Sequence, residues 1–315
     1  MTPVIEIEGL RKEFRRRGGR TVAVAGLDLS VPEGTVYGFL GPNGSGKTTT
    51  IRMLLGLVRP TSGRARLFGE DLPGCLPRQL RRVGAIVESP ALFPTMSGRE
   101  NLRILGRIDG IGQPRVDQVL EQVGLADRAG DAVRTYSLGM RQRLGLAAAL
   151  LKDPALVVLD EPANGLDPAG IRQVRELLRE LGREGRTVFV SSHILAEVEQ
   201  ACDRVAILSH GRCVADGTVT SVLAAAGPSG WLVKVDDLST GFDVLKNAAF
   251  DVEVVDGHLR VGGPTLSAPG EITRLLAAER LWVTELRSDE RSLEDLFLEL
   301  TSDDTTTTER EEAWR

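Results

Sequence analysis

A glycine-rich loop that ends in lysine and threonine has the most evident chemistry in the sequence. The octapeptide GPNGSGKT fits the pattern GxxxxGK[ST], in which successive backbone N–H groups point at phosphate oxygens. We expect Lys47 to bridge the β- and γ-phosphates of ATP and the Thr48 hydroxyl to bind Mg²⁺. The nucleotide-binding residues predicted here are Gly41, Pro42, Asn43, Gly44, Ser45, Gly46, Lys47, Thr48 and Thr49.

Two adjacent acidic residues supply a second part of the predicted site. Asp160 ends the apolar run ALVVLD, where its carboxylate can reach the magnesium shell of a bound triphosphate. Glu161 is placed to orient or deprotonate the attacking water. This pair favours a hydrolase over a small-molecule kinase, because a kinase must exclude water from its site.

The segments around these residues predict an α/β fold. The strand Thr35–Leu40 precedes the loop, and apolar residues from Ile51 to Val58 follow it at helical spacing. Further apolar runs, typical of parallel strands covered on both faces, are Ala155–Asp160, Thr187–Ser192 and Val205–Leu208. A crossover helix is indicated by Ile171, Val174, Leu177, Leu178 and Leu181. Strand, glycine loop and helix in this order begin a nucleotide-binding fold.

Two further structural parts are added to this core. Alternating residues at Val4–Ile7 and Leu27–Val31 predict an N-terminal β-hairpin, with Arg15–Arg20 as a polar turn. Residues 97–151 form a predicted helical insertion. Its helices are expected at Asn101–Arg107, Gln113–Val123 and Leu138–Leu151.

The chain resembles the ATP-binding-cassette (ABC) family once the sequence YSLGMRQR, residues 136–143, is added to these motifs. It is similar to the family's signature sequence, which contacts the γ-phosphate of the nucleotide bound by the opposite protomer. The resemblance implies that Ser137 and Gly139 bind nucleotide in this way, and a hydroxyl and an open N–H at a helix N-terminus suit that role. Leu138 and Met140 depart from the usual Gly and Gln. Taken alone, Ser-Leu-Gly is an ordinary helix N-cap.

The same resemblance implies roles for three other residues. His193 matches the family's switch histidine, which hydrogen-bonds the γ-phosphate. Asp167 matches a loop that communicates across the dimer of ATP-binding subunits. Phe14 matches the aromatic residue that stacks on adenine, and its alternative is a core position in the N-terminal hairpin.

Glu88 departs from the family pattern in an informative way. Family members usually carry glutamine here, where the amide contacts Mg²⁺ or the lytic water. A carboxylate can still bind magnesium, so Glu88 is a candidate metal ligand. We hypothesise that it also couples hydrolysis to transport. The run IVESP with YSLGM resembles the bacitracin and lantibiotic self-protection branch, and residues 292–298 resemble the ending of antibiotic and sodium exporter ATPases.

The predicted architecture is a P-loop NTPase core with an N-terminal antiparallel β subdomain and an inserted helical subdomain, followed by a small C-terminal α+β domain. The nucleotide-binding domain spans residues 1–225, and a βαββαβ unit, typical of a split βαβ fold, spans 226–300. Residues 301–315 are rich in threonine and acidic residues and are predicted to be disordered.

Composition narrows the classes of function. The chain has 315 residues, and its 39 Lys and Arg against 44 Asp and Glu give a net charge of −5, which argues against a nucleic-acid partner. The three cysteines form no CxxC pair, so neither a disulfide framework nor a zinc site is expected. No apolar run is long enough for a membrane helix, the longest being Leu144–Leu151.

The predicted function is therefore ATP hydrolysis by an ABC exporter subunit for an antibiotic, peptide or other amphiphile. The expected partners are a second copy of the chain and a separate integral-membrane permease. The permease is expected to dock near the helical insertion and residues 90–101 of this chain. The expected location is cytoplasmic, on the inner face of the membrane. The alternative is a soluble ABC-type ATPase that acts on ribosomes or DNA.

Overall fold

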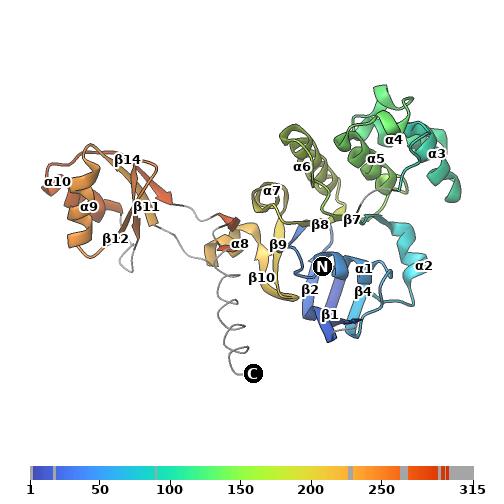
Figure 1. Ribbon diagram of the computed structural model, residues 1–315, viewed down its shortest axis with the longest axis horizontal. Coiled ribbons are helices and arrows are strands. Elements are labelled where there is room, and N and C mark those ends of the chain that lie inside the picture. The colour runs from blue at the N-terminus through green and yellow to red at the C-terminus, as the bar shows by residue number, and fades with distance from the viewer. Residues whose placement is uncertain are drawn as a thin grey trace. The chain divides into compact units, whose positions relative to one another are not determined.

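The computed structural model describes residues 3–16, 19–88, 91–225, 230–262, 269–289, 292–294 and 296–297 (Figure 1). The chain divides into two compact units, with the boundary after Val222.

A six-stranded sheet forms the centre of the first unit. Its strand order is β10-β9-β3-β8-β7-β6, and all neighbours are parallel except β10, which pairs antiparallel with β9. The strands are β3 (Val36–Leu40), β6 (Val83–Ile86), β7 (Leu156–Asp160), β8 (Thr187–Ser192), β9 (Arg204–Ser209) and β10 (Arg212–Thr218). Because β3, β7 and β8 are neighbours and parallel, the residues that follow them meet at one edge of the sheet.

Helices cover both faces of this sheet, which explains why its strands are apolar on both sides. Leu156 and Val158 of β7 pack in one buried cluster with α1 (Lys47–Leu54). Val157 and Leu159 pack in the other cluster with α6 (Pro168–Arg183), which is the predicted crossover helix. The short helix α7 (Leu195–Ala201) follows β8. The prediction of a parallel sheet covered on two faces is confirmed.

The helix after the glycine-rich loop is shorter than the apolar spacing predicted. Helix α1 ends at Leu54, and Val58 lies beyond it. Gly56 has φ 71°, its N–H bonds to Met53 O, and Leu57 N–H bonds to Arg52 O. These two bonds form a Schellman cap, in which a left-handed glycine ends the helix.

A second, antiparallel sheet contains the predicted hairpin. Its order is β2-β1-β4-β5. The strands are β1 (Pro3–Arg16), β2 (Gly19–Pro32), β4 (Ser62–Leu67) and β5 (Glu70–Asp71). The predicted turn at Arg15–Arg20 is too wide, because Arg15 pairs with Arg20 and Arg16 with Gly19. Strand ends that extend into solvent can carry arginine residues. A run of polar residues therefore does not by itself show where the strand ends and the turn begins.

The helical insertion lies between β6 and β7. It contains α3 (Gly98–Ile108), α4 (Gln113–Gln122) and α5 (Leu138–Leu150), as predicted within a few residues. Ser97 and Glu100 form a capping box at the start of α3. The remaining short helices of the first unit are α2 (Leu76–Gln79), η1 (Leu80–Arg82), η2 (Ala126–Arg128) and η3 (Val133–Thr135), and α8 (Val219–Ala225) spans the boundary between the units.

The second unit has the predicted βαββαβ order. Its elements are β11 (Gly230–Val235), α9 (Leu238–Asn247), β12 (Asp251–Val255), β13 (His258–Gly262), α10 (Pro269–Ala278) and β14 (Val283–Asp289). The sheet order β12-β13-β11-β14, with all pairs antiparallel, is that of a split βαβ fold. The expected disordered tail at 301–315, and much of the expected helix at Ser292–Leu300, lie outside the described residues.

The fold also describes the state of the three cysteines and the character of the helices. Cys75, Cys202 and Cys213 are free thiols. Among the described residues, no helix combines the length and the apolar character needed to cross a bilayer.

Candidate active site

The conformation of the loop between β3 and α1 is fixed by a left-handed glycine and by a backbone hydrogen bond. Gly46 precedes the helix with φ 106°, and a Cβ at this position would lie 2.5 Å from Ala23 O, so only glycine fits. Ser45 O accepts a hydrogen bond of 3.0 Å from Gly211 N. The chain can therefore curl tightly enough to present its N–H groups at the start of α1.

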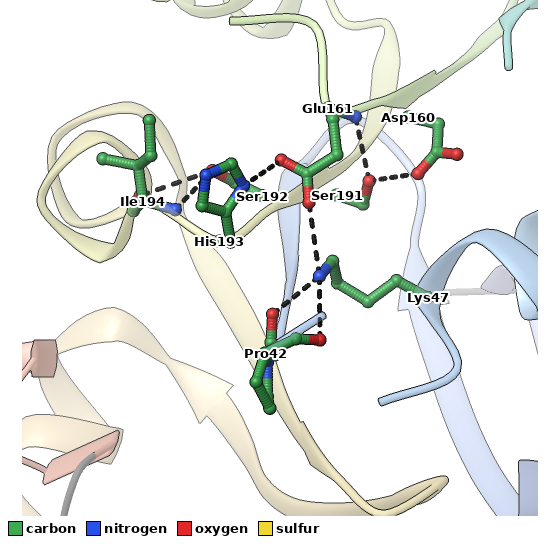
Figure 2. A network of polar contacts seen from close by, with 9 residues as sticks. Pro42, Lys47, Asp160, Glu161, Ser191, Ser192, His193 and Ile194 are labelled. Carbon is green, nitrogen blue, oxygen red and sulfur yellow. Dashed lines mark hydrogen bonds and ion pairs between the residues drawn. The ribbon is translucent and has the colours of Figure 1, made fainter. Parts of the chain in front are cut away.

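Lys47 is buried at the first position of α1. Its Nζ donates to Gly41 O at 2.6 Å and to Pro42 O at 3.3 Å, so the lysine bends back over its own loop (Figure 2). The same Nζ lies 3.2 Å from Glu161 Oε1. A single buried ammonium group thus joins the loop to the residue after β7.

Glu161 and His193 face each other across the ends of β7 and β8. Glu161 Oε2 lies 2.6 Å from His193 Nδ1, while its Oε1 contacts Lys47. Glu161 has φ 51°, a left-handed conformation that is uncommon for a residue with a side chain. The carboxylate is held from both sides, as a base that must be aimed at one water requires.

Asp160 ends β7 and is 3% exposed. Its Oδ1 accepts a 2.6 Å hydrogen bond from Ser191 Oγ, and the same hydroxyl oxygen accepts one of 3.0 Å from Glu161 N. Sequence reasoning missed Ser191. The available signal was a pair of serines at the end of an otherwise apolar strand, at Ser191 and Ser192.

These groups have the donor set that a magnesium triphosphate needs. Ser45 Oγ is buried and has no hydrogen-bond partner among the described residues, although it lies within the phosphate loop. Thr48 lies half-buried in the first turn of α1, and Asp160 adds a carboxylate. A hydroxyl, a carboxylate and an orphaned polar atom beside a buried lysine fit this ligand.

A second group of predicted residues lines a different surface. Ser137 and Gly139 at the start of α5, together with Asp167 at the start of α6, border a cleft of about 430 Å³. Ser137 Oγ accepts from Met140 N at 3.2 Å, and Asp167 Oδ1 accepts from Gly170 N at 3.1 Å, so both residues are N-caps. Within the described chain, no hydrogen bond or ion pair links this group to Lys47 or Asp160.

Glu88 lies after β6 with φ 63°, and its side chain is 65% exposed. It forms an ion pair with Arg52 of α1. Arg52 is four residues after Thr48, so the two lie on one face of the helix. The ion pair keeps Glu88 close to the helix that carries the predicted metal ligand.

Phe14 lies near the end of β1 and is 37% exposed. Lys12 Nζ is positioned 5.0 Å from the centre of its ring. The exposed fraction of 37% leaves part of the ring accessible for an adenine to stack on.

The comparisons with known proteins agree with this geometry. Residues 24–164 match the family model described as ABC transporter. The chain is 40% identical to the bacitracin transport ATP-binding protein BcrA of Bacillus licheniformis, over 95% of this chain and 98% of that protein. It is 36% identical to the daunorubicin/doxorubicin resistance ATP-binding protein DrrA of Streptomyces peucetius, over 99% and 97%. The structure of cbiO1 from Clostridium perfringens, part of the ABC transporter complex cbiONQ, superposes with a TM-score of 0.63 at 27% identity, over 72% of this chain and 92% of that one.

Proposed function

The chain belongs to the ATP-binding subunits of ABC transporters and is an ATP hydrolase, and from this premise we propose that it drives export of an antibiotic, a peptide or another amphiphile through a separate membrane permease. The observation that carries the proposal is the contact of Glu161 with both Lys47 and His193. This contact brings a phosphate-binding cation and a general base into one site. The relatives of the chain are named for transport and for drug resistance.

The roles of the site residues follow from their contacts. Lys47 binds the phosphates, and Glu161 accepts the proton of the attacking water. His193 orients Glu161 through its Nδ1 contact and offers its other ring nitrogen to the γ-phosphate. Thr48, Asp160 and Glu88 are the candidate ligands of Mg²⁺, which supplies charge neutralisation on the transferred phosphate. Phe14 is the proposed stacking partner of adenine.

Two copies of the chain are needed to complete each ATP site. Ser137, Gly139 and Asp167 line their own exposed cleft, separate in its contacts from Lys47. Each copy then carries the front of one site and the signature residues of the other. ATP favours the closed dimer because its γ-phosphate recruits donors from both copies, and hydrolysis removes those contacts.

The cargo class is suggested by relatives. BcrA is named for bacitracin transport and DrrA for daunorubicin/doxorubicin resistance, and both align with nearly the whole of this chain. Export of a compound of similar amphiphilic character is the proposed function here. The chain would then work on the inner face of the membrane, with residues 1–225 as its nucleotide-binding domain and the second unit supporting the dimer.

The competing function is that of a non-transport ATPase of the same superfamily that acts on ribosomes or DNA. The net charge of −5 gives a nucleic acid little electrostatic attraction. The similarity to a transport protein over 95% of the chain also favours the transporter.

Co-purification separates the two functions. The Glu161→Gln variant is isolated with Mg-ATP from gently solubilised cells, and its companions are identified by mass spectrometry. The Lys47→Ala/Glu161→Gln double variant, which should not close on ATP, is the matched control. A polytopic membrane protein in about equal amount supports the exporter, whereas ribosomal or DNA-repair proteins in its place would overturn it.

A further inference from the structure

Ser191 connects two residues of the site through a single atom. Its Oγ donates to Asp160 Oδ1 at 2.6 Å and accepts from Glu161 N at 3.0 Å. Figure 2 shows the Ser191 side chain between those two residues. A hydroxyl has one hydrogen to donate and lone pairs to accept with, so both functions are in use.

The sheet register brings these groups together. Asp160 of β7 is the direct partner of Ser191 in β8, and the strands are parallel. Side chains alternate along a strand, so Ser191 points to the same face as Phe189, and Asp160 to the same face as Val158. Phe189 and Val158 both pack in the cluster that contains α1. Ser191 and Asp160 therefore lie on the face from which Thr48 and Lys47 approach.

The Ser191–Asp160 hydrogen bond uses one carboxylate oxygen of Asp160 and leaves the other for a cation. Among the described residues, Ser191 Oγ is the only hydrogen-bond partner of the Asp160 carboxylate, and it occupies Oδ1. Asp160 is 3% exposed and Ser191 is fully buried, so water is a poor substitute for the hydroxyl. Oδ2 is left available for a cation.

The second bond acts on the backbone of Glu161. That residue has φ 51°, which costs free energy for any residue with a Cβ. Its N–H is held by Ser191 Oγ in this conformation. The direction of the Glu161 side chain toward Lys47 and His193 depends on that backbone geometry.

We propose that Ser191 is a positioning residue that fixes the metal-binding oxygen of Asp160 and the base Glu161 in one geometry. The inference rests on the roles proposed above for those two acidic residues. Because one hydroxyl holds both, its removal should disturb metal-dependent nucleotide binding and hydrolysis together.

The test compares three variants of the whole chain. Ser191→Ala removes the hydroxyl, and Ser191→Thr restores it. Thr187→Val is the matched control, because Thr187 is a fully buried hydroxyl of the same strand that accepts a 2.9 Å bond from Gly34 N, away from the site. Far-ultraviolet circular dichroism and thermal midpoints establish that each variant is folded.

Two readouts are measured on each variant. The first is kcat and KM for ATP, and the second is the dissociation constant of a fluorescent ATP analogue with Mg²⁺ and with EDTA. Ser191→Ala should lower kcat by about tenfold, the effect of losing one hydrogen bond to a charged group, and should raise KM for ATP as Mg²⁺-dependent binding weakens. The gain in affinity on adding Mg²⁺ should shrink. Ser191→Thr should recover both values, and Thr187→Val should change neither.

Two outcomes would overturn the inference. In one, Ser191→Ala hydrolyses ATP and responds to Mg²⁺ as the wild type does. In the other, Thr187→Val loses as much kcat and Mg²⁺-dependent affinity as Ser191→Ala, which would mean that Ser191 only stabilises β8. Asp160→Asn and Glu161→Gln are measured in parallel. If they behave as proposed while Ser191→Ala is silent, only this inference fails; if they too are silent, the proposed roles fail with it.

Discussion

Lys47 Nζ lies 3.2 Å from Glu161 Oε1, so the cation that should bind phosphate already neutralises the base that should activate water. Both side chains are largely buried, where their attraction is weakly screened. A triphosphate competes for the same ammonium group. We therefore expect nucleotide binding to release Glu161 from Lys47 while His193 continues to hold its other oxygen.

His193 should matter to the rate more than to nucleotide binding. His193→Ala removes the contact to Glu161 Oε2, and we expect kcat to fall about 10- to 100-fold, the range typical of a misplaced catalytic group. KM for ATP should rise less than kcat falls, because only the proposed contact of His193 with the γ-phosphate contributes to nucleotide binding. His258→Ala, which removes a histidine–carboxylate pair with Glu285 in the second unit, is the control and should leave kcat unchanged. Equal losses in both variants would contradict the orienting role.

The Glu88–Arg52 ion pair predicts opposite effects of its two members on magnesium dependence. Glu88→Gln removes a candidate anionic ligand, so half-maximal hydrolysis should need roughly three- to tenfold more Mg²⁺. Arg52→Gln frees the carboxylate from a competing cation and should lower the requirement. Thermal midpoints should barely move, because exposed ion pairs contribute little to stability.

The double variant Glu88→Gln/Arg52→Gln completes the test of that pair. It should resemble Glu88→Gln alone, since Arg52 is expected to act on magnesium only through the carboxylate. If Glu88→Gln left magnesium dependence, hydrolysis and transport unchanged, the proposed coupling role would be wrong.

Complementation tests the composite site. Gly139→Asp places a carboxylate at the N-terminus of α5, in the cleft shared with Asp167, and should prevent ATP-driven dimerisation without preventing ATP binding. Lys47→Ala should abolish ATP binding. Each variant alone is expected to be inactive, but an equal mixture should recover about a quarter of wild-type hydrolysis, because half the dimers are hybrids with one intact site. No recovery on mixing would contradict the two-copy site.

Glu197 of α7 predicts a pH-dependent stability. Burial raises the pKa of this carboxyl above its ordinary 4.5, against the opposing influence of His193 and Arg175. The unfolded chain then releases this proton first, so folded-state stability falls as pH rises from 4.5 through the folded-state pKa. Glu197→Gln should raise the thermal midpoint at pH 7, and the gain should vanish well below the ordinary pKa. The exposed Glu121→Gln is the control, and an equal gain there would contradict the assignment.

The site residues that could be predicted from the sequence are close to one another, or to a predicted strand, along the chain. Lys47 follows its glycines directly, Asp160 and Glu161 are adjacent, and each group is positioned by the strand before it. The Ser191–Asp160 bond and the Glu88–Arg52 pair join residues 31 and 36 positions apart. Neither contact follows from spacing, because it depends on which strands become neighbours and in what register.

The elements of the fold also differ in how well local sequence predicts them. Continuously buried strands such as β7 and β8 were predicted, whereas β4 (SGRARL) and β10 (RCVADGT) were missed because their polar residues hide the alternation. The end of α1 was also missed, since apolar spacing continued to Val58 while Gly56 ended the helix. Local patterns were reliable where one face is buried throughout an element. They failed where a glycine turn ends an element, as in α1, and where polar residues interrupt the alternation, as in β4 and β10.

The most direct test of the account is steady-state hydrolysis and sedimentation of the Glu161→Gln variant with Mg-ATP. A glutamine of the same shape cannot accept the proton, so hydrolysis should fall at least 100-fold while nucleotide still binds. ATP should then accumulate in a closed dimer that wild-type protein forms only transiently. Hydrolysis at the wild-type rate would contradict the assignment of Glu161 as the base on which the mechanism depends.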